Sequence, residues 1–218
     1  LAMSIALAGC LVGAMVSGTL ADRLGRKPLL LISAFIFLVS AYGTGAFQSF
    51  NAFLAARFIG GIAIGIASGL SPMYIAEIAP SHIRGKLVSL NQLTIVLGIL
   101  GAQVANYLIA EPMPSGTTVP PAGSWNVLMG WRWMFWSAAF PAALFLLMAL
   151  FIPESPRWLA MKGRQTQASK ILSNIGGETY ANAEIAAVCN GEHQNNTEKQ
   201  GGLKMLFSKP FRLVLTIG

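Results

Sequence analysis

The sequence predicts an all-α membrane protein, and three observations support this fold class. Hydrophobic residues make up 54% of the 218 residues and charged residues only 11%, which is too little polar surface for a soluble domain of this size. Several apolar runs are long enough to cross a bilayer as helices. All Lys and Arg residues except Arg57 and Arg132 fall in three stretches, around 22–27, around 81–86 and after Pro153.

Five spans are expected in order along the chain. The first ends before Asp22, the second lies between Lys27 and Gln48, and the third ends before Pro80. The fourth follows Lys86, and the fifth ends before Pro153. In windows of about 20 residues they cover residues 1–21, 28–47, 52–78, 87–109 and 132–152.

The basic stretches orient the spans, because cytoplasmic loops are biased toward Lys and Arg. Residues 22–27, the loop at Arg84 and the tail after Pro153 are therefore expected inside, with 48–51 and 111–130 outside. Because the chain starts within an apolar run at Leu1, we expect at least one earlier helix. The predicted domains are a five-span bundle (1–152), a cytoplasmic helical linker domain (153–210) and the start of a further span (211–218).

Composition also excludes several functions. A soluble enzyme does not fit, and the net charge of +7 reflects the membrane-flanking loops rather than nucleic-acid binding. Cys10 lies in an apolar run and Cys189 in the polar tail, so a disulfide between them would join different compartments. We expect no metal and no cofactor.

Arg57 is the most costly residue of the predicted bundle. It lies about five residues, or about 8 Å, into the third span from its outer end, where a central charge costs at least about 2.5 to 3.5 kcal/mol. It either reaches the headgroups or pairs with an acid. Glu77 is at the opposite end of this span, so a paired carboxylate would come from the helix expected before Leu1.

Two other patterns lie within the spans. Gly61, Gly65 and Gly69 line one face of the third span, which allows close helix packing and also permits sliding. The fourth span carries the polar residues Asn91, Gln92, Thr94, Gln103 and Asn106. These side chains either bond neighbouring helices or bind a neutral polyhydroxylated ligand beside Ile95, Val96 and Ile99.

Acids and bases recur together at the cytoplasmic ends of the spans. The groups are Asp22 with Arg23, Arg26 and Lys27, Glu77 with Arg84, and Glu154 with Arg157. Exposed ion pairs contribute only about 0 to 1 kcal/mol each, so each pair adds little to the stability of the fold. Several together bias an equilibrium between two conformations, which is what a cytoplasmic gate requires.

Four motifs in these segments resemble the sugar porter family of the major facilitator superfamily. They are GTLADRLGRK from Gly18, RFIGG from Arg57, PMYIAEIAPSHIRG from Pro72 and PESPRWL from Pro153. The resemblance implies the second to sixth helices of the N-terminal bundle of a twelve-helix transporter. It also implies an intracellular helical domain and alternating access around a central sugar site.

The resemblance assigns roles to individual residues. Gln92 matches a sugar-contacting glutamine, and Ile95, Val96 and Ile99 match the wall of that pocket. Arg57 matches an arginine that faces an aspartate of the first helix in proton-coupled members. The residues that match the cytoplasmic ion-pair network are Arg26, Glu77, Arg84, Glu154 and Arg157.

Two positions depart from the family's proton-coupled pentose carriers. Ile99 replaces a glutamine, so a hexose such as D-glucose stays open beside D-xylose. Ala138 replaces a glutamate, so proton coupling would depend on the first-helix acid.

The leading hypothesis is a multi-pass transporter of the bacterial inner membrane that moves a neutral monosaccharide with a proton. Its partners would be the sugar, the proton, lipid and the remaining helices of the complete transporter. The alternatives are a passive uniporter of the same fold and a non-transporting membrane sugar sensor.

Overall fold

The computed structural model describes residues 2–112 and 123–198, with side chains at all of these except 81 and 187–198. The chain divides into two compact units, the first ending at Ser155 and the second beginning at Pro156. Every regular element in the described part is a helix, as the sequence predicts. The further span predicted at 211–218, and residues 199–210 of the predicted linker domain, lie outside the described residues.

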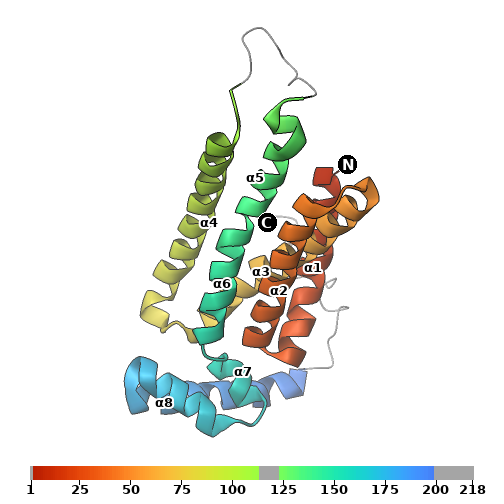
Figure 1. Cartoon of the computed structure of the whole chain (residues 1–218). Coiled ribbons are helices and arrows are strands. Elements are labelled where there is room, and N and C mark those ends of the chain that lie inside the picture. Colours follow the sequence, from red (N-terminus) through yellow and green to blue (C-terminus); the bar gives the residue numbers. More distant parts are fainter. Residues whose placement is uncertain (1, 113–122, 199–218) are drawn as a thin grey trace, which may run out of the picture. The chain divides into compact units, whose positions relative to one another are not determined.

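Seven helical elements form the first unit (Figure 1). They are α1 (Ala2–Leu24), α2 (Arg26–Ala46), α3 (Phe50–Ile78), α4 (Ser81–Ile109), the π-helix η1 (Asn126–Gly130), α5 (Trp131–Ser137) and α6 (Ala139–Phe151). Five stretches of the described chain are helices long and apolar enough to cross a membrane: α1, α2, α3, α4 from His82, and the run from Asn126 to Phe151. These correspond in order to the five predicted spans.

The fifth span differs from the continuous helix that its apolar run predicts. It starts as a turn of π-helix and is interrupted at Ala138, between α5 and α6. Pro141 accounts for the interruption, because proline lacks the N–H that would bond the carbonyl four residues earlier and its ring clashes with that carbonyl. The break therefore lies one turn before the proline.

α1 and α3 pack through small residues on both helices. The buried residues of α1 are Gly9, Gly13, Ser17 and Ala21, one per turn, and α3 presents buried Gly61 and Gly65. A Cβ on Gly13 would overlap the carbonyl oxygen of Ile62, and one on Gly65 would overlap that of Cys10. The two backbones are in direct contact, as small residues at four-residue spacing allow. Close packing is thus confirmed for Gly61 and Gly65, whereas the sliding that the same spacing permits stays a prediction.

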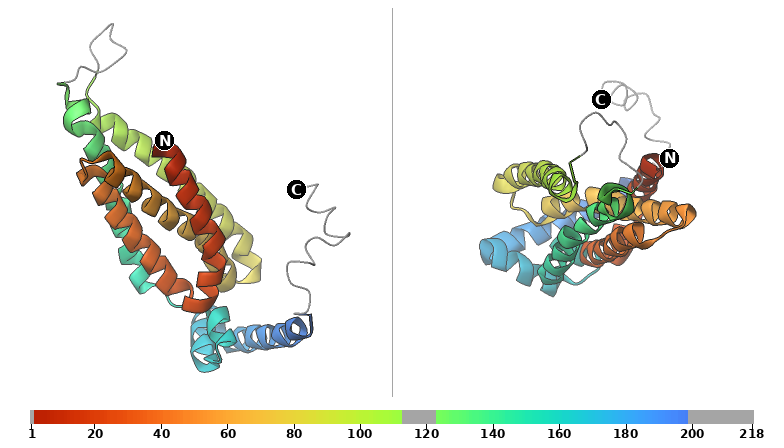
Figure 2. Two further views of the ribbon diagram at one scale, coloured as in Figure 1. Left: turned by 90° about the vertical axis from the view of Figure 1, so that its right-hand side faces the viewer. Right: turned by 45° about the horizontal axis from the view of Figure 1, so that its top comes forward.

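The remaining helices surround α3 unevenly. α2 packs on α3 and also contacts α5 and α6, whereas α4 contacts α3 and α5. The right-hand view of Figure 2 shows α4 (yellow-green) apart from α1 (red). A buried cluster near the turn between α1 and α2 joins α1, α2 and α3 through Ala21, Leu29, Leu30, Ile66 and Leu70. α1, α2 and α3 therefore share the core of this unit, while most of α4 is left exposed.

The turn between α1 and α2 is a single residue, Gly25. Its backbone has φ 98° and ψ 165°, a region that essentially only glycine occupies. A Cβ at this position would also come within 2.6 Å of a carboxylate oxygen of Glu154.

The second unit contains α7 (Pro156–Met161) and α8 (Gln165–Glu198), which is kinked at Gly177. Leu159 and Ala160 of α7 form a buried core with Ala168 of α8, and Trp158 and Ile171 pack against it. α8 therefore has one buried face, which includes Ala168, Leu172 and Ala181.

Candidate functional site

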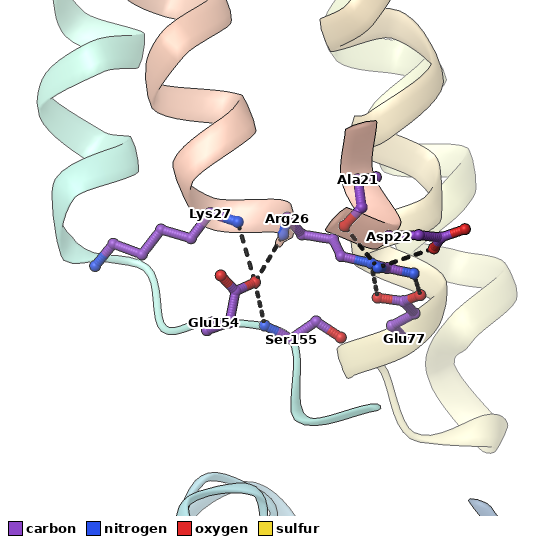
Figure 3. Close-up of polar contacts among 7 residues, drawn as sticks. All are labelled: Ala21, Asp22, Arg26, Lys27, Glu77, Glu154 and Ser155. Carbon is purple, nitrogen blue, oxygen red and sulfur yellow. Dashed lines mark hydrogen bonds and ion pairs between the residues drawn. The ribbon is translucent and has the colours of Figure 1, made fainter. Parts of the chain in front are cut away.

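The end of α1, the start of α2 and the end of α3 meet at Arg26, whose side chain is 5% exposed (Figure 3). Its Nε and Nη2 donate to the two carboxylate oxygens of Glu77, at 2.9 and 2.7 Å. Its Nη1 donates to the Ala21 carbonyl at 3.0 Å and to Asp22 at 3.3 Å. Every nitrogen of the guanidinium has a partner, which a buried cation needs to offset its desolvation. The fork geometry with Glu77 is the strong form of this pair.

Glu154 holds the start of α2 from a different direction. Its Oε1 accepts from the backbone N–H groups of Arg26, Lys27 and Ser155, at 2.9, 3.1 and 2.9 Å. A helix leaves its first N–H groups without internal partners and carries partial positive charge there. Glu154 therefore acts as an anionic cap of α2, and it ties the segment after α6 to that helix.

Two further bonds fix the same segment. Lys27 Nζ donates to the Leu150 carbonyl at 2.9 Å, near the end of α6. The Tyr74 hydroxyl of α3 donates to the Pro153 carbonyl at 2.7 Å. Four chain segments are thus joined at one end of the first unit.

This arrangement brings together some of the predicted gate residues and corrects one predicted pair. Glu77 pairs with Arg26 of α2, whereas Arg84 is exposed and donates only a long 3.4 Å bond to the Ala79 carbonyl. Packing explains this pairing, because α2 lies against α3 and the Arg26 guanidinium reaches both carboxylate oxygens of Glu77. Asp22 joins through its i,i+4 relation to Arg26. Arg157 belongs to α7, in the second unit, and is exposed.

Arg57 lies in the membrane-spanning part of α3 among aromatic rings. Its Cζ is 4.3 Å from the ring centroid of Phe135 and 6.0 Å from that of Phe53. Phe53, Phe135 and Trp131 also contact each other edge to face. Within the described residues no carboxylate forms an ion pair with Arg57, and its Nε is buried without a hydrogen-bond partner. The rings stabilise the cation in part and leave one donor unsatisfied.

The predicted sugar-contacting residues lie on α4, which no described helix covers over most of its length. Gln92, Ile95, Val96 and Ile99 are all exposed in the described structure. Of these, Ile95 lines a cavity of about 370 Å³ between α2, α3, α4 and α6, together with Asn91. The cavity also has three hydroxyl residues that sequence reasoning missed, Ser33, Ser68 and Ser71. Their only signal in the sequence is a polar residue inside an apolar run.

The geometry therefore separates two kinds of chemistry within one bundle. A satisfied ionic cluster around Arg26 joins the helix ends at one end of the first unit. At membrane depth lie an arginine with an unsatisfied donor and a helix face that carries a neutral amide. Such a face can exchange hydrogen bonds with hydroxyl groups, which are donors and acceptors of the same kind.

Comparisons with known proteins cover the whole chain. A family profile described as "Sugar (and other) transporter" matches residues 1–218. An arabinose-proton symporter of Bacillus subtilis is 41% identical over 218 residues, which is 100% of this chain and 45% of the relative. A D-xylose-proton symporter of Escherichia coli K12 is also 41% identical, over 93% of this chain and 43% of the relative.

Solved structures agree with the sequence comparison. A structure of the proton:xylose symporter XylE bound to 6-bromo-6-deoxy-D-glucose superposes with a TM-score of 0.80 and 40% identity. A partially occluded inward-open structure of XylE from E. coli gives 0.79 and 40%. The two matches cover 94% and 92% of this chain and 45% and 49% of those chains. The chain spans a little under half the length of the relatives that it matches.

Proposed function

Because the chain belongs to the sugar transporter family, we propose that it forms one half of a proton-coupled monosaccharide transporter. It is a multi-pass integral membrane protein, and its fold is that of the N-terminal bundle of major facilitator transporters. The substrate class is a neutral pentose or hexose, such as D-xylose or D-glucose. Transport proceeds by alternating access, with two bundles rocking about a site between them.

The observation that carries this proposal is the uncovered amide face of α4. Gln92 is exposed at membrane depth, where an amide without partners is costly. Lipid tails offer no hydrogen bonds, but sugar hydroxyls accept and donate at the same site. Ile95, Val96 and Ile99 lie on the next turns of α4 and form the apolar wall against which a sugar ring packs.

Replacing Gln92 with alanine is expected to raise the KM for sugar uptake about tenfold, because one or two neutral hydrogen bonds to the substrate are lost. Uptake of D-xylose and D-glucose by vesicles containing the complete protein measures this. Thr94→Val is the matched control, since Thr94 lies on the opposite face of α4 and bonds the Leu90 carbonyl of its own helix. An unchanged KM in the Gln92 variant would remove this residue from the site.

Arg57 is the proposed coupling residue. Its Nε is buried without a hydrogen-bond partner. A carboxylate from another helix of the complete transporter would pair with this nitrogen and neutralise the charge of the guanidinium. A guanidinium favours the charged form of a neighbouring acid, so protonation of that acid would release Arg57. The release would permit the rocking step and link proton movement to sugar movement.

Arg57→Leu is therefore expected to abolish accumulation of sugar driven by an imposed proton gradient, so that the ratio of internal to external sugar falls to about 1. Exchange of sugar at equilibrium should persist. Sugar uptake and external pH are recorded together, and alkalinisation should accompany uptake in the unmodified protein and in Arg57→Lys but not in Arg57→Leu. Arg57→Lys, which keeps the charge, is the control. Undiminished uphill uptake by Arg57→Leu would refute the coupling role.

A passive uniporter is the second candidate, because the described neighbours of Arg57 are aromatic rings rather than acids. In that case sugar uptake by the unmodified protein would proceed without alkalinisation.

The cytoplasmic cluster is the proposed gate. Arg26, Glu77, Glu154 and Asp22 already hold the helix ends of one bundle together. Exposed Arg84 and Arg157 are proposed to complete the network in one of the two conformations.

A further inference from the structure

The end of the first unit opposite to Arg26 contains a second cavity, which shares Phe53 and Trp131 with the aromatic surroundings of Arg57. The transport proposal uses none of its other lining residues. It has a volume of about 540 Å³ and is lined by Phe47, Gln48, Ser49, Phe50, Phe53, Trp131 and Arg132. These residues come from the corner between α2 and α3 and from the start of α5. A cavity of this size accommodates a small organic ligand or a lipid headgroup.

The depth of the cavity in the membrane follows from the length of α2. This helix begins at Arg26 in the cytoplasmic cluster and ends at Ala46, beside the cavity. At 1.5 Å per residue, its 21 residues span about 30 Å, the thickness of the hydrocarbon core. The cavity is therefore at the outer interface, at the level of the lipid headgroups.

The lining carries one cation and no acid. The Arg132 guanidinium is 5.0 Å from the ring centroid of Trp131, and its Nε is buried without a hydrogen-bond partner. Within the described residues Arg132 forms no ion pair with a carboxylate. Ser49 accepts from the Ala52 N–H and keeps its own hydroxyl hydrogen as a donor. Gln48, which also lines the cavity and is exposed, adds an amide donor.

We infer that this cavity binds the phosphate group of an outer-leaflet phospholipid, with Arg132 as the cationic ligand. A phosphodiester supplies the negative charge and acceptor oxygens that Arg132 lacks, in the geometry that a guanidinium fork matches. The aromatic residues suit the adjacent glycerol and upper acyl chain, as aromatic side chains do at membrane interfaces. A neutral sugar would leave the charge of Arg132 uncompensated.

Photolabelling tests the site in the complete protein. Vesicles containing phosphatidylglycerol with a photoactivatable acyl chain are irradiated, and the labelled peptides are mapped by mass spectrometry. Label is expected within 47–53 and around 131–132, and Arg132→Gln should reduce it about tenfold. Gln48→Glu, at an exposed position, should reduce it in the same way by placing a negative charge beside the phosphate.

The controls separate this site from general attraction to basic residues. Arg23→Gln removes an exposed cation at the cytoplasmic end and should leave the label at the outer cavity unchanged. Equal labelling in the unmodified protein and in both cavity variants would overturn the inference. Loss of the label on adding excess inorganic phosphate would assign the site to a free anion and would also overturn it, as would an equal loss in Arg23→Gln.

Discussion

Replacing Arg26 with methionine is expected to destabilise the first unit by about 3 to 5 kcal/mol. Methionine keeps much of the aliphatic length of the side chain but removes all its donors. Glu77, whose side chain is 8% exposed, is then buried as an anion without its cation. The free energy of unfolding of the complete protein, measured in detergent micelles by denaturant or heat, should fall by this amount.

The matched variants distinguish a lost pair from a general loss of charge. Arg23→Met removes an exposed cation three residues away and should change the free energy of unfolding by less than about 1 kcal/mol. The double variant Arg26→Met, Glu77→Met should be more stable than Arg26→Met alone, because it leaves no unpaired buried charge. Wild-type stability in Arg26→Met would show that the pair is not buried in the membrane-embedded protein.

Gly13→Ala is expected to cost about 1 to 3 kcal/mol by forcing α1 and α3 apart. The obstructing atoms belong to the backbone of Ile62, which cannot rotate away as a side chain would. Gly65→Ala should act in the same direction, against the carbonyl of Cys10. Thermal unfolding of the complete protein measures both effects.

Gly18→Ala is the control within the same helix, because a Cβ there meets no described atom within 4 Å. It should be neutral or raise stability by up to about 1 kcal/mol, since alanine favours helix over glycine. If Gly13→Ala and Gly18→Ala had the same effect, the close backbone contact of α1 with α3 would be wrong.

Sequence reasoning predicted the helices of the first unit well, because the length of an apolar run and the bases that flank it are local properties. It missed the break at Ala138, although Pro141 stands in the printed sequence. The fifth span was predicted from the length of its apolar run, and the effect of one proline within that run was not considered. Gly61 and Gly65, two buried glycines of α3, were recognised by their spacing, but the matching positions of α1, Gly9 and Gly13, were not.

The candidate site was less predictable, since it depends on contacts between distant segments. The pair of Asp22 and Arg26 follows from i,i+4 spacing, whereas the pair of Arg26 and Glu77 joins residues 51 positions apart. No local pattern encodes that contact, which arises only when α2 packs on α3. For the same reason, the sequence around Arg57 or around Phe135 did not predict the contact of the Phe135 ring with the Arg57 guanidinium.

The single-residue turn at Gly25 has a consequence at the level of the gene. Every missense change reachable by one nucleotide from a glycine codon introduces a side chain, the smallest being alanine and others being as large as arginine or tryptophan. None fits a backbone at φ 98°, and each would intrude on the Glu154 carboxylate that caps α2. This codon should therefore stand out in a saturation-mutagenesis map as a position where no substitution is tolerated, between two helices whose lipid-facing positions accept many.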